Sequence, residues 1–401
     1  MYFEKENLWT RDSKSELILT IMASIAQEES RSISQNTTWG RRVSFQNGKV
    51  SFAYSKFLGY KKVDDKLVII EEEAETVRII YRMFLFDGQT PAGIAKYLMS
   101  QGIKSVSNST WRPHVILSIL TNEKYKGDAL LQKTFTENYL EKKMVKNTGQ
   151  IPQYYVENNH PAIIDKDMWE LVQFEIKRRK EMVGGYSAAN MFSAKIKCID
   201  CGGYYGRKTW HSNSKYRRSI YRCNKKYEEG KDKCNTPHLS EDEIKKQFIE
   251  TYNLLIKDKK EIEKELKNKM HSLGNTKKIE KKISLLNDKL LLVAEQINNL
   301  VKEYPRTNSE VEEYNKKKRL LKEKYDSLIT EKNDLTELKR ENIAMSYRIK
   351  SLLLVLKKTK GKLKEWSNEI WMLTVESAVV CKDKKIKFNF YLKDIIERTQ
   401  E

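Results

Sequence analysis

The chain has 401 residues, a formal net charge of +21 and an isoelectric point near 9.4, and this length fits two or three domains. The excess of Lys and Arg points to a polyanionic partner, most directly nucleic acid. A Lys-rich proteome from an AT-rich genome would give the same charge. No apolar run approaches the roughly 20 residues of a membrane span, so the sequence excludes a transmembrane protein and predicts a cytoplasmic one.

The N-terminal segment is predicted to form one long helix. Ser13 and Glu16 have the spacing of a capping box, and the apolar periodicity carries the helix to about residue 36. A basic connector follows, which is either a flexible linker or an arm laid along a DNA groove. Its basic residues are Arg41, Arg42 and Lys49.

Three further helices are predicted at residues 71–86, 91–99 and 111–120. Glutamates in the first turn favour the first of them, and the second and third begin after Thr90 and Thr110. The two shorter helices resemble a helix-turn-helix, whose second helix lies in the major groove. An ordinary helical hairpin with solvated polar residues fits the pattern equally well. The apolar face of the third helix would carry Trp111, Val115 and Ile119, and its polar face Arg112, His114 and Ser118.

Four of the five cysteines form two pairs, Cys198 with Cys201 and Cys223 with Cys234. Two thiolate pairs on tight turns can close a tetrahedral shell around one zinc ion. Two disulfides are the alternative, but these are rare in a reducing cytoplasm. The spacing therefore predicts structural zinc, and the fifth cysteine, Cys381, is expected to be a small buried apolar residue.

The C-terminal half is predicted to contain an antiparallel coiled-coil hairpin. Apolar residues alternate at spacings of four and three from Ile279 to Tyr304, and a weaker seam runs from Val311 to Leu335. The polar break at residues 305–309 supplies the turn. Strand-forming residues at 371–375 and 386–390 then predict a β-hairpin that returns to complete the zinc-bearing sheet.

Several of these segments, in this order, resemble the large serine recombinases. The stretch from Leu19 to Arg31 resembles the long helix that ends their catalytic domain, and the cysteine quartet with its inserted coiled coil resembles their zinc ribbon. Their recombinase domain is resembled at residues 57–60, 72–74, 87–88, 111–122, 125–127 and 160–165. The resemblance implies a multidomain, mainly α fold with α+β parts.

The resemblance also predicts the domain boundaries. Residues 1–38 would be a remnant of the catalytic domain with its long C-terminal helix, 39–185 the recombinase DNA-binding domain, and 186–401 the zinc-ribbon domain. Within the last, the coiled coil would span about 242–358 and the returning β-hairpin about 370–392.

As the resemblance implies, the partner is double-stranded DNA at attachment or transposon-end sites, and the cofactor is structural zinc. Arg41 and Arg42 would lie near the minor groove and Arg112 and His114 at the major groove, and Lys49 and Ser118 would also contact DNA. A second major-groove contact would involve Arg207, Lys208, Lys215, Arg217 and Arg218, for which a solvated basic loop is the alternative. Self-association through the long helix and the coiled-coil tip would form dimers on DNA and tetramers at synapsis.

The nucleophilic serine and the arginine cluster of the family find no counterpart in the sequence. Ser13, Ser15, Ser24 and Ser30 lie on or beside a helix, without arginines behind them. A serine nucleophile needs an activating environment and an oriented phosphate. The sequence therefore predicts a nucleoid-associated fragment of an integrase or transposase that binds DNA without cutting it. A non-catalytic regulator or decoy of recombination sites, or a zinc-ribbon adaptor without DNA affinity, is the alternative.

Overall fold

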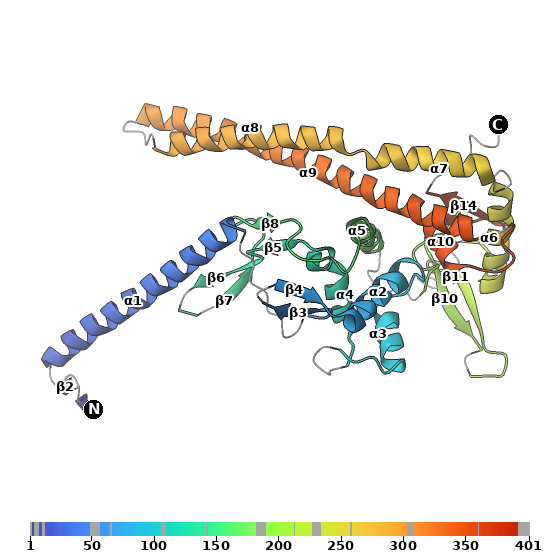
Figure 1. Cartoon of the computed structure of the whole chain (residues 1–401), viewed down its shortest axis with the longest axis horizontal. Coiled ribbons are helices and arrows are strands. Elements are labelled where there is room, and N and C mark those ends of the chain that lie inside the picture. Colours follow the sequence, from blue (N-terminus) through green and yellow to red (C-terminus); the bar gives the residue numbers. More distant parts are fainter. Residues whose placement is uncertain are drawn as a thin grey trace. The chain divides into compact units, whose positions relative to one another are not determined.

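The computed structural model contains two compact units (Figure 1), formed by residues 1–74 with 123–163 and by residues 75–122 with 164–401. No helix in the described part of the chain is long and apolar enough to cross a membrane. The structure describes residues 2–3, 8–9, 13–48, 57–64, 66–105, 110–138, 140–141, 143–181, 190–211, 213–226, 234–256, 259–302, 308–359 and 361–391.

The first unit begins with a two-stranded ribbon, β1 (Tyr2–Phe3) and β2 (Leu8–Trp9), followed by helix α1 (Ser13–Gln46). The helix runs ten residues beyond the predicted end near residue 36, so the predicted connector at Arg41 and Arg42 is wrong. Its backbone hydrogen bonds continue past Gly40, because an isolated glycine costs a helix only about 1 kcal/mol. The side chain of Ser13, the first residue of the predicted capping box, and Lys49 lie outside the described residues.

Three small antiparallel sheets complete the first unit: β3 (Tyr60–Val63) with β4 (Lys66–Ile69), β5 (Ala129–Leu131) with β8 (Tyr154–Val156), and β6 (Thr134–Asn138) with β7 (Lys143–Lys146). The 3₁₀ helix η2 (Glu123–Lys126) precedes β5. The ring of Tyr60 stacks on that of Phe57 at 4.8 Å, and its hydroxyl donates to the carbonyl of Pro161 at 2.8 Å. Gly59, at φ +87°, donates its N–H to Glu73 at 2.8 Å.

Four helices form the first part of the second unit: α2 (Glu71–Leu85), whose first turn belongs to the first unit, α3 (Pro91–Ser100), α4 (Pro113–Thr121) and α5 (Lys166–Glu181). Thr90 caps α3 as predicted, because its hydroxyl accepts from the N–H of Gly93 at 3.0 Å. The third predicted helix begins two residues late, at Pro113, whose missing N–H suits the first helical position. Trp111 precedes it and donates its indole N–H to Ile103.

The zinc-ribbon region has two three-stranded sheets. The first contains β10 (Tyr205–Trp210), β11 (Arg218–Cys223) and β12 (Leu239–Ser240). In the second, β13 (Val375–Val380) pairs antiparallel with β14 (Ile386–Phe390) and parallel with β9 (Ile196–Cys198). The last strands therefore return to the strand that carries the first cysteine, as predicted.

Residues 371–375 were predicted as a strand, and this is wrong for most of them. They form the end of helix α10 (Asn368–Thr374), and the strand begins only at Val375. Ser367 caps this helix by accepting from the N–H of Ile370. All residues from Ile370 to Thr374 are buried. A short, continuous apolar run shows no periodicity, so its sequence alone cannot tell a buried helix from a strand.

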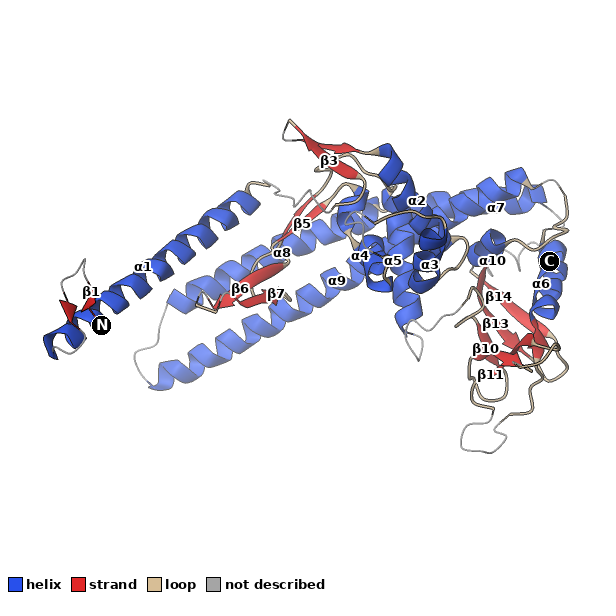
Figure 2. Ribbon diagram, turned by 90° about the horizontal axis from the view of Figure 1, so that it is seen from below, coloured by secondary structure: helices blue, strands red, loops and turns tan. Residues whose placement is uncertain are grey.

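The coiled coil lies between these sheets in sequence, and its described residues are helical apart from short breaks at Ile256 and at residues 275–276. Helices α6 (Glu241–Leu255) and α7 (Lys259–Gly274) lead into α8 (Lys277–Lys302), which packs against α9 (Asn308–Lys358) as the predicted antiparallel hairpin (Figure 2). Leu286, Leu290 and Val293 of the predicted seam are buried. α9 extends the second helix by more than twenty residues beyond the predicted seam and packs on α5 and α7.

One hydrophobic core joins the ribbon, the base of the coiled coil and the C-terminal strands. Trp371 is fully buried in it. Its ring lies 5.2 Å from Phe192, 5.1 Å from Phe248 and 5.4 Å from Trp366, measured between centroids. Its indole N–H donates to the carbonyl of Met191 at 3.2 Å, so its polar atom is satisfied as well.

We expect the substitution Trp371→Ala to lower the free energy of unfolding by about 3–5 kcal/mol, because it removes a buried aromatic ring and leaves a cavity. Chemical denaturation followed by circular dichroism measures the loss. The matched control is Trp39→Ala on α1, where the side chain is 69% exposed and a change below about 0.5 kcal/mol is expected. Equal effects of the two substitutions would contradict the central place of Trp371.

Candidate metal centre and nucleic-acid interface

The four predicted cysteines come together in space. The Sγ atoms of Cys198, Cys201, Cys223 and Cys234 all lie within 4.8 Å of one another. Cys198 is the last residue of β9 and Cys223 the last residue of β11. Each of the two sheets therefore positions one cysteine of one pair. Gly202 turns the chain at φ +66° beside Cys201, and a Cβ on Gly203 would lie only 3.1 Å from the sulfur of Cys223. Cys381 is half-buried and does not belong to the cluster.

The surroundings of the cluster favour the thiolate form of one cysteine. Burial opposes ionisation of Cys198, but hydrogen bonds from the Thr236 hydroxyl and from the backbone of Cys201 and Asp200 outweigh it and lower its pKa to about 7. Burial raises the pKa of Cys201 and of Cys223.

The donor set fits a zinc ion. Four sulfurs are the ligands of a closed structural zinc site, and three of the four cysteines are buried. The carboxylate of Asp200, next to Cys201, accepts from the N–H of Asn235 at 3.1 Å and so ties the first cysteine turn to the second. Zinc held here would have no open position for substrate, so its role would be structural.

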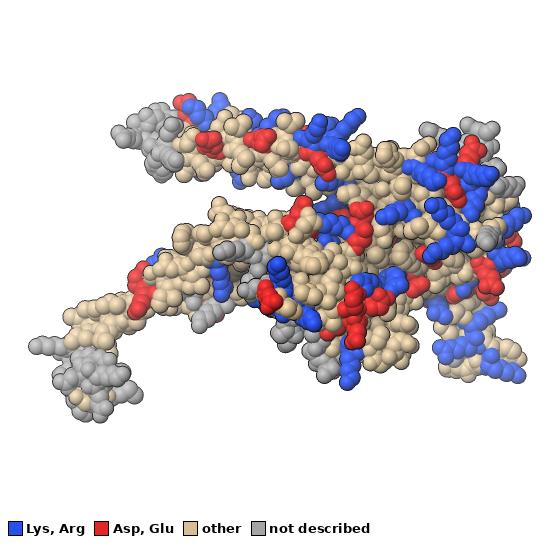
Figure 3. Space-filling model, in the orientation of Figure 1, with Lys and Arg blue, Asp and Glu red and all other residues tan. Residues whose placement is uncertain are grey.

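The hairpin of β10 and β11 carries the predicted second group of basic residues, and Figure 3 shows blue side chains gathered where it projects. Trp210 pairs with Arg218 and Lys208 with Ile220, so these side chains share one face. The Arg218 guanidinium lies 5.3 Å from the ring centroid of Trp210. Arg207 lies on the opposite face and donates to Ser219 at 3.1 Å.

Lys215 and Arg217 lie in the connection between these strands, and both are exposed. The five basic residues predicted for this region therefore do not form a single row: Lys208 and Arg218 lie on one face, Arg207 on the other, and two in the connection. Arg222 adds a further half-buried guanidinium on the face of Lys208. Side chains alternate between the two faces of β11, and the observed pairing with β10 places Arg222 on the face of Lys208. The sequence alone does not give this pairing, so it did not identify Arg222.

The start of α4 carries the predicted major-groove residues. Arg112 is the residue before the first helical turn, and its side chain makes no capping hydrogen bond. His114 and Ser118 follow on the exposed face, one turn apart, whereas Ile116, Ile119 and Leu120 are buried. All three polar residues are exposed: His114 and Ser118 lie on one side of α4, and Arg112 lies just before the helix.

Arg41 and Arg42 are exposed on the last turns of α1. They are positioned by a regular helix rather than by an extended arm. Lys49 lies outside the described residues.

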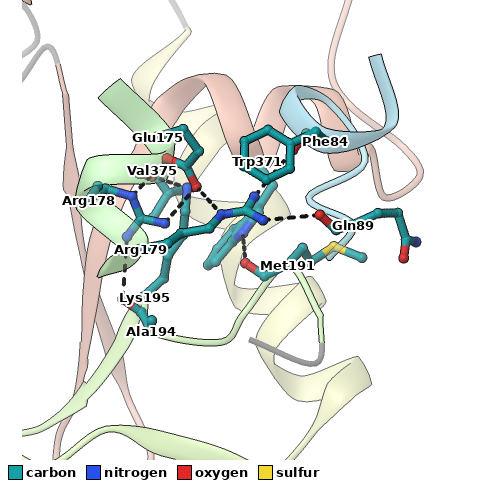
Figure 4. Close-up of polar contacts among 10 residues, drawn as sticks. All are labelled: Phe84, Gln89, Glu175, Arg178, Arg179, Met191, Ala194, Lys195, Trp371 and Val375. Atoms are coloured by element: carbon teal, nitrogen blue, oxygen red, sulfur yellow. Dashed lines mark hydrogen bonds and ion pairs between the residues drawn. The ribbon is translucent and has the colours of Figure 1, made fainter. Parts of the chain in front are cut away.

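A buried ion network joins α5 to the zinc-ribbon region (Figure 4). The carboxylate of Glu175 accepts from Arg178 through two nitrogens and from Arg179 through Nε, each at 2.8 Å. Burial alone would raise the pKa of Glu175, but the two guanidinium groups hold it well below its usual range.

The cations of this network also bind backbone carbonyls from distant segments. Arg179 donates to the carbonyls of Phe84 at 3.2 Å and Gln89 at 3.0 Å, at the end of α2 and just beyond it. The ammonium of Lys195 donates to Val375 at 2.6 Å. Burial and the positive charge of Arg178 lower the pKa of Lys195 well below its ordinary value.

The comparisons with known proteins agree with these two regions. Residues 71–179 match the family model Recombinase, and residues 191–253 match the recombinase zinc beta ribbon domain. No curated protein matches the sequence. A crystal structure of an LSR–DNA complex is 18% identical, with 85% of this chain and 94% of that chain covered and a TM-score of 0.37. A structure concerned with the Listeria innocua prophage attP site is 25% identical, with 51% and 80% covered and a TM-score of 0.29.

The two matched domains follow one another in the order that the sequence motifs predicted. Together they define a DNA recombinase with a zinc-ribbon domain. The chain belongs to the large serine recombinase family.

We expect Glu175→Gln to lower the free energy of unfolding by about 3–5 kcal/mol, because it leaves Arg178 and Arg179 buried without a counter-charge. The folded-state pKa of Glu175 is depressed, so its contribution is complete above the unfolded pKa of roughly 4.3 and is lost as the pH falls through the folded value. Denaturation at pH 7 and at lower pH measures this.

The matched control is Glu181→Gln at the exposed end of α5, which should change stability by less than about 0.5 kcal/mol. Equal stability of Glu175→Gln and the wild type at pH 7 would contradict a structural role for the network.

Proposed function

We propose that this chain is the DNA-recognising portion of a site-specific large serine recombinase. The observation that carries the proposal is the exposed basic hairpin of β10 and β11, which projects from a buried four-cysteine cluster. Both belong to the same compact unit as α4. Exposed Lys and Arg side chains bind phosphates and position a protein on the duplex, whereas base edges are read in the grooves.

In this proposal the start of α4 and the hairpin of β10 and β11 contact different parts of the DNA. Arg112 and His114 of α4 would read base edges in the major groove, where Arg pairs with guanine. Lys208 and Arg218 on the hairpin would contact a second segment of duplex, mainly through phosphates. Zinc bound by Cys198, Cys201, Cys223 and Cys234 would fix the base of the hairpin, and the coordination bonds are all the chemistry it would supply.

Self-association is part of the proposal. The exposed side of α1 carries apolar side chains, among them Leu17 at 65% and Ile25 at 61% exposure, and an exposed apolar stripe on a helix is suited to a second copy of the same helix. Dimers on DNA through α1, and tetramers at synapsis through the coiled-coil tip, follow the predicted mode of the family.

We also propose that the serines of α1 do not cleave DNA. Ser24 is exposed and donates its hydroxyl proton to the carbonyl of Thr20 at 2.8 Å. The neighbouring Arg31 pairs with Glu28 at 3.5 Å. A hydroxyl that bonds its own helix, without a base or a group of arginines, is not an activated nucleophile.

For DNA binding, we expect the double variant Lys208→Ala and Arg218→Ala to weaken binding to any duplex sequence. Each phosphate contact that is lost should flatten the slope of log affinity against log salt by about 0.9. Fluorescence anisotropy over a salt series, with duplexes that the protein selects from a random library and with an unselected duplex, measures both quantities.

The control for DNA binding is Lys289→Ala with Arg319→Ala, which removes the same two charges from exposed positions on the coiled coil. An equal loss in both double variants would show that net charge alone drives binding. The absence of any salt-dependent binding by the wild type would instead support the adaptor without DNA affinity.

For the metal, we expect Cys201→Ser to abolish stoichiometric zinc binding and to unfold the ribbon, since metal-binding energy in such sites is folding energy. Elemental analysis after dialysis and thermal denaturation measure the two effects. Cys381→Ser is the matched control, because Cys381 lies outside the cluster, and it should retain one zinc per chain. Full zinc retention by Cys201→Ser would exclude the four-sulfur site.

A further inference from the structure

A buried hydroxyl group lies between two sulfurs that belong to different cysteine pairs. Thr236 is 1% exposed, and its Oγ1 lies 3.1 Å from the Sγ of Cys198 and 3.4 Å from that of Cys234. Cys198 is 38 residues away in sequence and Cys234 only two. The hydroxyl therefore spans the two halves of the cluster.

The backbone of Thr236 is held independently of its side chain. Its carbonyl accepts from the ammonium of Lys226 at 2.9 Å, and Lys226 follows Cys223 by three residues. The next carbonyl, that of Pro237, accepts from the hydroxyl of Tyr205 at 2.9 Å. Because both neighbouring carbonyls are anchored, the threonine hydroxyl is fixed in direction toward the sulfurs.

The chemistry of the pair determines which atom donates. A thiolate that binds a metal has no proton and can only accept, so the hydroxyl must donate. Its single proton can be donated to either sulfur, and the contact to Cys198 is the shorter one. Hydrogen bonds to metal-bound ligands orient them and tune their charge, and they are a regular source of metal affinity.

Backbone N–H groups reach three of the four sulfurs. Backbone N–H groups of Asp200 and Cys201 donate to Cys198, that of Gly203 to Cys201 and that of Lys225 to Cys223. We propose that the Thr236 hydroxyl, buried between the two cysteine pairs, is a positioning group for the metal-binding sulfurs of Cys234 and Cys198. This inference rests on the proposed zinc site.

The test uses the full chain loaded with one equivalent of zinc and challenged with an excess of a chromogenic chelator. We expect Thr236→Val, which keeps the side-chain shape but lacks the hydroxyl, to release zinc roughly 10–100 times faster than the wild type. Thr236→Ser, which keeps the hydroxyl, should stay within about threefold of the wild-type rate. The matched control is Thr374→Val, another buried threonine, whose hydroxyl bonds the carbonyl of Ile370, and it should release zinc at the wild-type rate.

A spectroscopic measurement separates positioning from a general loss of stability. With cobalt in place of zinc, the thiolate-to-cobalt charge-transfer band should move to longer wavelength in Thr236→Val, because the sulfurs lose a donor. Thr374→Val should leave the band unchanged. If Thr236→Val does not fold, Thr236→Ala replaces it with the same expected results, since it removes the hydroxyl without placing a methyl group beside the sulfurs.

Three outcomes would overturn the inference: wild-type release rate and spectrum in Thr236→Val, equal acceleration in Thr374→Val, or a Thr236→Ser variant as fast as Thr236→Val. In each of these the wild type still binds one zinc, so the proposed metal site stands. A wild type that binds no zinc would overturn the metal site itself, and the role of Thr236 with it.

Discussion

A single buried carboxylate, that of Glu175, is the constraint on which the second unit depends. It lies between Arg178 and Arg179, with Lys195 also buried nearby. One negative charge does not neutralise two guanidinium groups, and an uncompensated buried charge costs several kcal/mol. The remaining donors therefore have to find carbonyl oxygens, which come from Phe84, Gln89, Ala194 and Val375. Satisfying these side chains thus ties three distant segments of the chain to α5.

This arrangement has a consequence for DNA recognition. The first matched domain ends at residue 179 and the second begins at residue 191, so the network joins the last turn of one to the first residues of the other. α4 packs on α5, and the ribbon hairpin is anchored beside Lys195 through the shared core. The ion network at the boundary between the two domains therefore limits independent movement of α4 and the hairpin. Any separation of the two would leave buried charged groups without their hydrogen-bond partners.

Local and periodic signals in the sequence predicted much of this structure. The cysteine spacing predicted the cluster, and the heptad pattern from Ile279 predicted the α8–α9 hairpin, because both depend on contacts set by spacing alone. The prediction of a strand at Trp371 was wrong, because this apolar segment forms a helix whose residues are buried on all its faces. The ion network was not foreseen at all. Its members, from Phe84 to Val375, meet only in the folded chain, and isolated Lys and Arg residues read as solvated surface.

The return of β13 to β9 is the longest-range contact of the ribbon, with Ala378 paired to Ile196. The entropic free energy of closing a flexible loop between these two strands would be only about 0.6 kcal/mol higher than that of closing a loop of half the length. The intervening helices reduce even this cost, because α8 and α9 fold back on each other and α9 packs along α7. An antiparallel hairpin brings its own two ends close together. The strands on either side of the insertion are therefore joined as if by a short connection and not by a long flexible loop. The far end of the coiled coil can therefore vary in length or sequence without changing the register of β9, β13 and β14.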